Sequence, residues 1–167
     1  MEPKDINQFI EAWGAMGVLW GINRSMARVH AFLLMQSSSI ELDEVAKQLH
    51  ISRGNASMCL KELRNWGLIR RMHQSGDRRD FYMVEPDVWN MFFRIVVERK
   101  KREFDPALHS LRHLLAETNL EKDKKVQQRL EQMEEILSTT NGIMHRLLSD
   151  VEKPRKLLNF LKHFNPK

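Results

Sequence analysis

Apolar residues in the first half of the chain recur at spacings of three and four, which is the period of an amphipathic helix. This spacing predicts helices over residues 5–20, 24–36, 40–49 and 53–66. Asn23 and Ser52 precede the second and the fourth of these segments, where a side-chain oxygen can cap a helix. Gly21 and Gly67 follow the first and the fourth segments, and glycine commonly ends a helix.

The spacing of the apolar residues changes after residue 67. Residues 68–73 and 81–85 have the pattern of two short strands, and residues 75–77 carry turn chemistry between them. Asp87 is then placed to cap a helix over residues 88–103. The alternation therefore predicts a β-hairpin followed by a long helix.

The last third of the chain returns to helical spacing. Pro106 is expected to break or kink the long helix, and residues 107–118 to continue it. Apolar residues at alternating spacings of four and three, interrupted only by Thr140, are Val126, Leu130, Met133, Leu137, Met144, Leu147 and Val151. This heptad pattern is typical of a helix that packs against a partner helix, in the same chain or in a second copy. A final helix is expected over residues 154–164.

The order of these elements is that of a winged helix-turn-helix, in which two short helices and a tight turn precede a two-stranded hairpin. We therefore predict a mainly α protein with a small β-hairpin, built as a winged helix-turn-helix plus a helical dimerisation region. Residues 1–22 would form a supporting and dimerisation helix, and residues 23–86 the DNA-binding domain. Residues 87–167 would form the dimerisation and effector region.

Composition narrows the class of protein. The chain has 167 residues, of which 42% are hydrophobic and 29% are charged, as in a soluble globular protein. It contains no apolar run long enough to span a membrane, and its first residues lack the layout of a signal peptide. Its single cysteine, Cys59, excludes an intrachain disulfide. We therefore expect a cytoplasmic protein with no membrane partner.

Positive charge is concentrated in one stretch. Residues 52–79 hold seven basic side chains and two acidic ones, so this window accounts for the whole net charge of +5. Such a concentration indicates a surface for a polyanion such as nucleic acid. The competing interpretation is a solvated face that happens to be basic.

The helix that follows Ser52 begins with short polar residues, and in a winged helix-turn-helix this end of the helix enters the major groove. The side chains expected to contact DNA from this helix are Arg53, Asn55, Ser57, Met58, Lys61 and Arg64. We assign Arg53, Asn55 and Ser57 to bases, because arginine can pair with guanine and asparagine with adenine. Lys61 and Arg64 are assigned to phosphates. The alternative role for Asn55 and Ser57 is helix capping.

Arg78 and Arg79 lie at the tip of the predicted hairpin, where burial cannot explain them. An arginine on a narrow loop suits a narrow minor groove, which has an enhanced negative potential. Asp77 and Asp80 flank the pair and are expected to orient its guanidinium groups. The alternative is an exposed turn with ordinary charges.

Three stretches, GINRSMARVHAFLL, ISRGNASMCLKELRNWGLIRR and GDRRDFY, resemble the GbsR-like branch of the MarR-type transcriptional regulators. The resemblance extends from about Phe9 to Pro106. It implies a homodimeric winged-helix repressor that binds a pseudo-palindromic operator in double-stranded DNA. Several members of this family control the uptake or synthesis of osmoprotectants such as glycine betaine, so we expect a regulon of that kind.

The resemblance also suggests a small quaternary ammonium or another osmolyte as the effector. Candidate aromatic residues for such a site are Trp20, Trp66, Trp89 and Phe92. Aromatic faces attract such a cation through their quadrupoles. The alternative is that these rings are packed in the core and that the protein responds to ionic strength directly.

Other chemistry has less support in the sequence. His109 and His113 have a spacing that can hold a metal, but no third ligand completes a local motif, and we expect a surface or interface pair. No nucleophile elbow or nucleotide loop is present, so we expect neither an enzyme nor a cofactor. The alternatives to an osmoprotectant regulator are a winged-helix module that binds another protein, and a regulator of an unrelated regulon that responds to salt or another ligand.

Overall fold

The computed structural model describes residues 2–19, 21–117 and 124–149. The chain divides into two compact units, Met1–Met91 and Phe92–Lys167. The functional division predicted at residues 22 and 86 stays a prediction. None of the described helices combines the length and the apolar character needed to cross a membrane.

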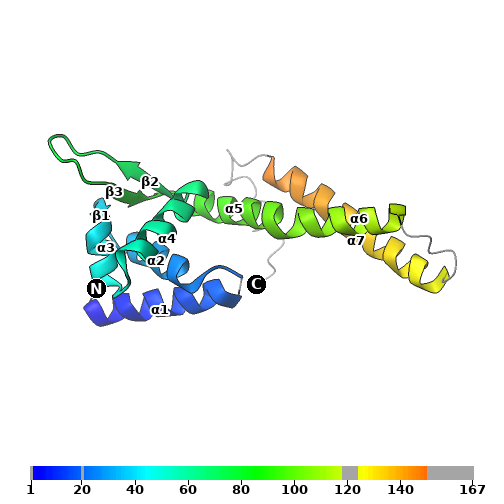
Figure 1. The fold of residues 1–167 in the computed structure, drawn as a ribbon, viewed down its shortest axis with the longest axis horizontal. Coiled ribbons are helices and arrows are strands. Elements are labelled where there is room, and N and C mark those ends of the chain that lie inside the picture. The colour runs from blue at the N-terminus through cyan, green and yellow to red at the C-terminus, as the bar shows by residue number, and fades with distance from the viewer. Residues whose placement is uncertain (1, 20, 118–123, 150–167) are drawn as a thin grey trace, which may run out of the picture. The chain divides into compact units, whose positions relative to one another are not determined.

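The first unit is a winged helix-turn-helix, so the predicted fold class is confirmed. Its elements are α1 (Pro3–Leu19), α2 (Arg24–Leu34), β1 (Ile40–Glu41), α3 (Leu42–Gln48), α4 (Arg53–Asn65), β2 (Ile69–Met72) and β3 (Phe81–Val84). The wing is the long hairpin formed by β2 and β3 (Figure 1). Helices α3 and α4 form the helix-turn-helix, and α2 packs behind α4.

The described sheet has three strands where the sequence predicted two. Residues Ile40 and Glu41 were expected to begin a helix, and that expectation is wrong. They form β1, which pairs with β3 in a sheet of order β1-β3-β2. Glu41 is extended, with φ −73° and ψ 150°, and α3 begins after it. This pairing satisfies backbone groups on the outer edge of β3 that would otherwise be open.

Capping residues end and begin the helices as the sequence predicted. The Asn23 side chain accepts a hydrogen bond from the Met26 amide (3.2 Å), and the Ser52 hydroxyl accepts one from the Asn55 amide (3.1 Å). Gly21 and Gly67 have φ of 72° and 70°, which is the left-handed conformation typical after a helix. These local signals mark the end of α1, the start of α2 and both ends of α4.

The core of this unit is formed where α2, α3 and α4 meet the sheet. Its most deeply buried side chains are Val29, Leu33, Val45, Leu60, Leu63, Leu68 and Ile69. Helix α1 lies close against α2, because a Cβ atom added at Gly17 would stand only 2.6 Å from the Cβ of Ala27. Burial of the inner face of α4 holds its opposite face towards solvent.

The described residues of the second unit lie almost entirely in helices. They are the end of α5 (Val88–Arg99), a π-helical segment (Lys100–Phe104), α6 (Asp105–Glu117) and α7 (Lys124–Leu148). The α-helical hydrogen-bonding register changes just before Pro106, where the sequence predicted a break or kink. Proline has no N–H to donate and its ring displaces the carbonyl one turn earlier, which a local π-helical segment accommodates.

Helix α7 confirms the predicted heptad helix, but the heptad positions fall into two groups. Leu130, Leu137 and Met144 are half-buried on the side that meets α6, where Arg112 Nε lies 2.7 Å from Glu134 Oε1. Met133 and Leu147 are exposed, together with Ile136 and Ile143. Val151 and the predicted helix over residues 154–164 lie outside the described residues.

Candidate nucleic-acid interface

Helix α4 presents a polar and basic face to solvent. Ala56, Leu60 and Leu63 are buried against α2 and α3, which fixes the rotation of the helix about its axis. The exposed side chains include Arg53, Ser57, Met58, Lys61 and Arg64. They are five of the six residues predicted to contact DNA from this helix.

Asn55, the sixth residue, is half-buried and has partners inside the protein. Its Nδ2 atom donates to the Ser25 hydroxyl (3.3 Å), and its Oδ1 atom accepts from Cys59 Sγ (3.4 Å). The amide therefore links α4 to α2, which sequence spacing did not reveal. A base contact by Asn55 stays a prediction, and it requires adenine to replace these two partners.

Arg53 is held by a carboxylate of the neighbouring helix. Its Nε atom donates to Asp43 Oδ1 at 2.6 Å, and both side chains are largely exposed. An ion pair this exposed contributes little to stability. It does orient the guanidinium group at the end of α4, and this group must leave Asp43 or share it in order to pair with a base.

Arg79 is tied to the wing and to β1. Its Nε atom donates to both oxygens of Asp77 (3.0 Å each), and its Nη1 atom donates to Glu41. The guanidinium group also lies over the ring of Phe81, 5.5 Å from its centroid. Hydrogen bonds from Arg79 lower the pKa of Asp77 to about 2, and Asp77 raises the pKa of Arg79. The predicted orienting role of Asp77 is confirmed, whereas Glu41 was not predicted.

Arg78 and Asp80, the two neighbours of Arg79 in the sequence, make different contacts. Asp80 was expected to orient the tip arginines, and this prediction is wrong, because it pairs with Arg71 on β2. Arg71 lies opposite Tyr82 in the register of the two strands, and Asp80 directly precedes β3, so the ion pair joins β2 to the end of the hairpin loop. The Arg78 guanidinium is exposed and has no ion-pair partner within the described residues. It is the arginine of this pair that can meet a phosphate without breaking an existing contact.

The predicted effector residues lie in different surroundings. Trp20 is outside the described residues. Trp66 is buried at the end of α4, and its Nε1 atom donates to Glu62 Oε1 at 3.1 Å. Trp89 and Phe92 are exposed, and they fall in different units. The aromatic effector site stays a prediction.

The surroundings of Cys59 and of the pair His109 and His113 indicate structural roles. Cys59 is buried, and burial raises the pKa of its thiol, which disfavours the reactive thiolate. The rings of His109 and His113 are 6.5 Å apart, and His113 Nε2 lies 3.2 Å from Glu117 Oε1. No group of three metal-ligating side chains is gathered anywhere in the described ranges.

Comparisons with known proteins agree with this geometry. Residues 32–81, which run from the end of α2 to the start of β3, match the model of the MarR family. The HTH-type transcriptional repressor GbsR of Bacillus subtilis (strain 168) is 24% identical over 114 residues, which are 64% of this chain and 63% of that protein. The match thus spans slightly less than two thirds of the relative's length. These findings confirm the resemblance predicted from the motifs.

A solved structure described as a transcriptional regulator has the same fold. It superimposes with a TM-score of 0.66 at 23% identity, over 89% of this chain and 99% of that one. The likeness extends well beyond residues 32–81, because it covers 89% of this chain.

Proposed function

We propose that this chain, whose residues 32–81 carry a MarR-family domain, is a DNA-binding transcriptional regulator that works in the cytoplasm as a repressor. The observation that carries the proposal is the exposed face of α4. An apolar stripe fixes the helix in the protein, while three basic side chains and two small or flexible ones project from it. A helix presented in this way fits the major groove.

The division of labour on this surface follows from the partners of each side chain. Lys61 and Arg64 are exposed on the second half of α4, where a docked helix faces the phosphate backbone. Arg78 extends from the wing towards the adjacent minor groove. Arg79 instead holds the wing to β1 through Glu41, so it sets the angle at which Arg78 is presented.

A repressor of osmoprotectant genes is the specific form of this proposal. It rests on the resemblance of the three motifs and on the name of the relative from Bacillus subtilis, a transcriptional repressor. The effector proposed with it is a small quaternary ammonium or another osmolyte.

A homodimer completes the proposal, because one winged helix contacts too few base pairs for specificity. The apolar side chains exposed on α7 supply a surface for the second copy. Ile136 and Ile143 are 65% and 54% exposed and lie one heptad apart. Apolar residues at this spacing are expected to pack between two helices.

The proposal is tested by selecting binding sites from a randomised DNA pool and measuring their affinity as a function of salt. We expect an inverted-repeat motif to be enriched. Lys61→Ala and Arg78→Ala should each weaken binding to all sequences and lower the slope of log affinity against log salt by about one unit. Lys4→Ala removes the same charge from the exposed surface of α1 and should change neither quantity.

A winged-helix module that binds another protein is the second candidate. The pairing of Arg53 and Arg79 with carboxylates of the same chain favours it, since part of the basic surface is already neutralised. No enriched motif, together with DNA binding that Lys61→Ala and Lys4→Ala weaken equally, would support this alternative and reject the regulator.

A further inference from the structure

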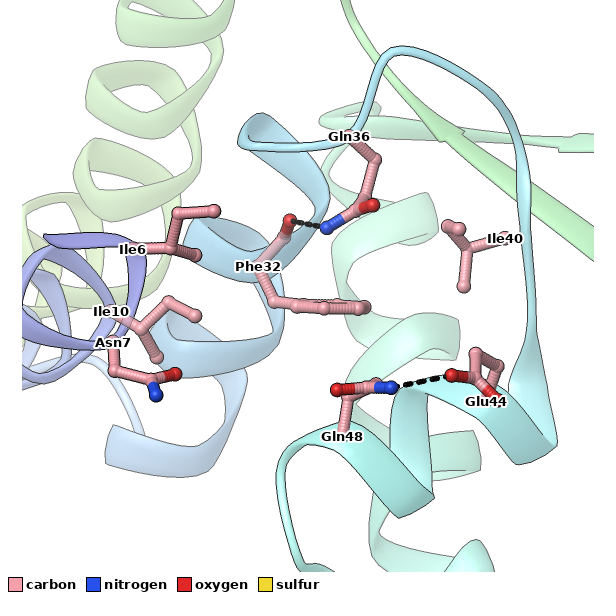
Figure 2. Close-up of a pocket in the computed structure, with 8 residues that line it drawn as sticks. All are labelled: Ile6, Asn7, Ile10, Phe32, Gln36, Ile40, Glu44 and Gln48. Carbon is pink, nitrogen blue, oxygen red and sulfur yellow. Dashed lines mark hydrogen bonds between the residues drawn. The ribbon is translucent and has the colours of Figure 1, made fainter. Parts of the chain in front are cut away.

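A cavity lies in the first unit, away from the exposed face of α4. It has a volume of about 310 Å³ and is lined by Ile6, Asn7, Ile10, Phe32, Gln36, Ile40, Glu44 and Gln48. Figure 2 shows the ring of Phe32 between the side chains of α1 on one side and those of β1 and α3 on the other. The volume falls at the lower end of the range for small-molecule sites, roughly 300–1,000 Å³.

The lining divides into an apolar part and a polar part. Ile6, Ile10 and Ile40 supply aliphatic surface, and Phe32 supplies one aromatic ring. Glu44 is the only ionisable side chain of the lining, so the cavity has a negative charge and no positive one of its own. A ligand with an apolar body and a positive end matches this distribution.

Two hydrogen bonds decide which polar atoms remain for a ligand. Gln48 Nε2 donates to Glu44 Oε1 at 2.6 Å, and Gln36 Nε2 donates to the Phe32 carbonyl at 3.2 Å. The acceptors are a backbone carbonyl and a carboxylate, which cannot donate a hydrogen bond. Each glutamine must therefore turn its NH2 group, and not its oxygen, towards its partner. The carbonyl oxygens of the two glutamines and the second oxygen of Glu44 are left as acceptors. Because Glu44 is the one charged side chain in the lining, its carboxylate favours a hydrogen-bond donor that carries a positive charge.

We propose that this cavity binds a small organic ammonium ion that carries N–H groups and an apolar chain, such as a primary alkylamine. Its ammonium group would donate to Glu44, and its chain would cover the three isoleucines. Lys47 Nζ lies 3.9 Å from Glu44 Oε2, but this side chain is exposed and can turn into solvent when a ligand arrives. The proposal is independent of DNA binding.

The first test is calorimetric titration of the full chain with n-hexylammonium. Hexanoate, 1-hexanol and N,N,N-trimethylhexylammonium serve as ligands of opposite charge, of no charge and without N–H donors. We expect hexylammonium to bind at least about fivefold more tightly than each of the three, since a charge-assisted hydrogen bond is the interaction that they lack. Equal binding of the trimethyl compound would refute the donor requirement, and equal binding of hexanoate would refute the role of charge.

Matched variants locate the site. Glu44→Gln should weaken hexylammonium binding about tenfold or more, because it removes the charge and keeps the size of the side chain. Asp43→Asn removes the same charge one residue earlier on α3, outside the cavity lining, and should leave binding within about twofold of wild type. Equal effects of the two substitutions would overturn the site.

Isoleucine methyl resonances provide a readout that does not depend on a variant folding. Hexylammonium should shift the methyl signals of Ile6, Ile10 and Ile40, which line the cavity, and leave that of Ile69 in β2 unchanged. Shifts confined to isoleucines outside the lining would place the ligand elsewhere and overturn the proposal.

Discussion

The Asn55 side chain is suited to two different roles, base recognition and hydrogen bonding within the protein. Its position on the first turn of α4 suits base recognition, yet its amide bonds to Ser25 on α2 and to Cys59 on its own helix. A half-buried amide with two partners is expensive to displace, because its partners are then left unsatisfied. DNA binding must therefore offer a better-aligned partner than Ser25.

Substitution separates these two roles. Asn55→Ala should cost about 1–3 kcal/mol on the selected site and relax the preference at one base pair. Ser25→Ala removes the partner on α2 and leaves the face of α4 intact, so it should preserve the preference. Site selection with both variants is the measurement, and an unchanged motif in Asn55→Ala would show that Asn55 serves only the packing of α4.

His30 is a second residue whose surroundings lead to a measurable effect, on the pH dependence of stability. It is buried on α2 beside Trp13, and its Nε2 atom lacks a hydrogen-bond partner among the described residues. Burial lowers its pKa to about 4. The imidazole is therefore neutral in the folded protein at neutral pH.

We expect acid to destabilise the fold through His30. Below pH 6.5 the unfolded chain binds a proton at this histidine, whereas the folded chain does so only near pH 4. The free energy of unfolding should therefore fall between these values, by up to about 3 kcal/mol. His30→Leu should be as stable at pH 7 and should lose most of this dependence in denaturant titrations. Identical pH dependence in both proteins would contradict the assignment.

At the scale of elements, two glycines in different helices have opposite surroundings. A Cβ atom at Gly17 would meet Ala27 across the contact between α1 and α2, whereas a Cβ atom at Gly54 would have no atom within 4 Å. Gly54 thus gives α4 no packing advantage within the chain. We expect the absence of a side chain at Gly54 to matter for DNA binding, because it would let the first turn of α4 approach DNA closely.

This contrast gives a matched pair of variants. Gly17→Ala should lower the free energy of unfolding by about 1–3 kcal/mol, because the two helices must move apart. Gly54→Ala should leave it unchanged or raise it by up to about 1 kcal/mol, since alanine favours helix, while it weakens DNA binding. Thermal unfolding and fluorescence anisotropy measure the two effects. Full DNA affinity in Gly54→Ala would mean that the backbone of α4 stays away from DNA.

At the scale of the whole molecule, α7 carries two apolar faces and only one of them meets α6. The exposed face predicts that the chain is a dimer at micromolar concentration. Ile136→Glu combined with Ile143→Glu should produce monomers in sedimentation experiments, because two charges would be buried in the interface. Gln128→Glu combined with His145→Glu adds the same charges at exposed polar positions and should leave the dimer intact. A wild-type monomer would refute the prediction.

The sequence by itself determined the features that depend on neighbouring residues. Helix limits at Asn23, Ser52 and Gly67, the inner stripe of α4 and the position of the hairpin all follow from caps, spacing and turns within a few residues. These interactions join residues that are close in the sequence, so their pattern can be recognised from the sequence alone. The same holds for the heptad pattern that becomes α7.

Tertiary structure decided how distant residues meet. Arg79 reaches Glu41 across 38 positions, and Asn55 reaches Ser25 across 30. Strand β1 consists of two residues whose pairing with β3 overrides the helical pattern around them, because the edge of β3 needs hydrogen-bond partners. The cavity beside Glu44 likewise joins residues from α1, α2, β1 and α3. Such contacts depend on how packed elements come together in three dimensions, and no local spacing along the chain encodes them.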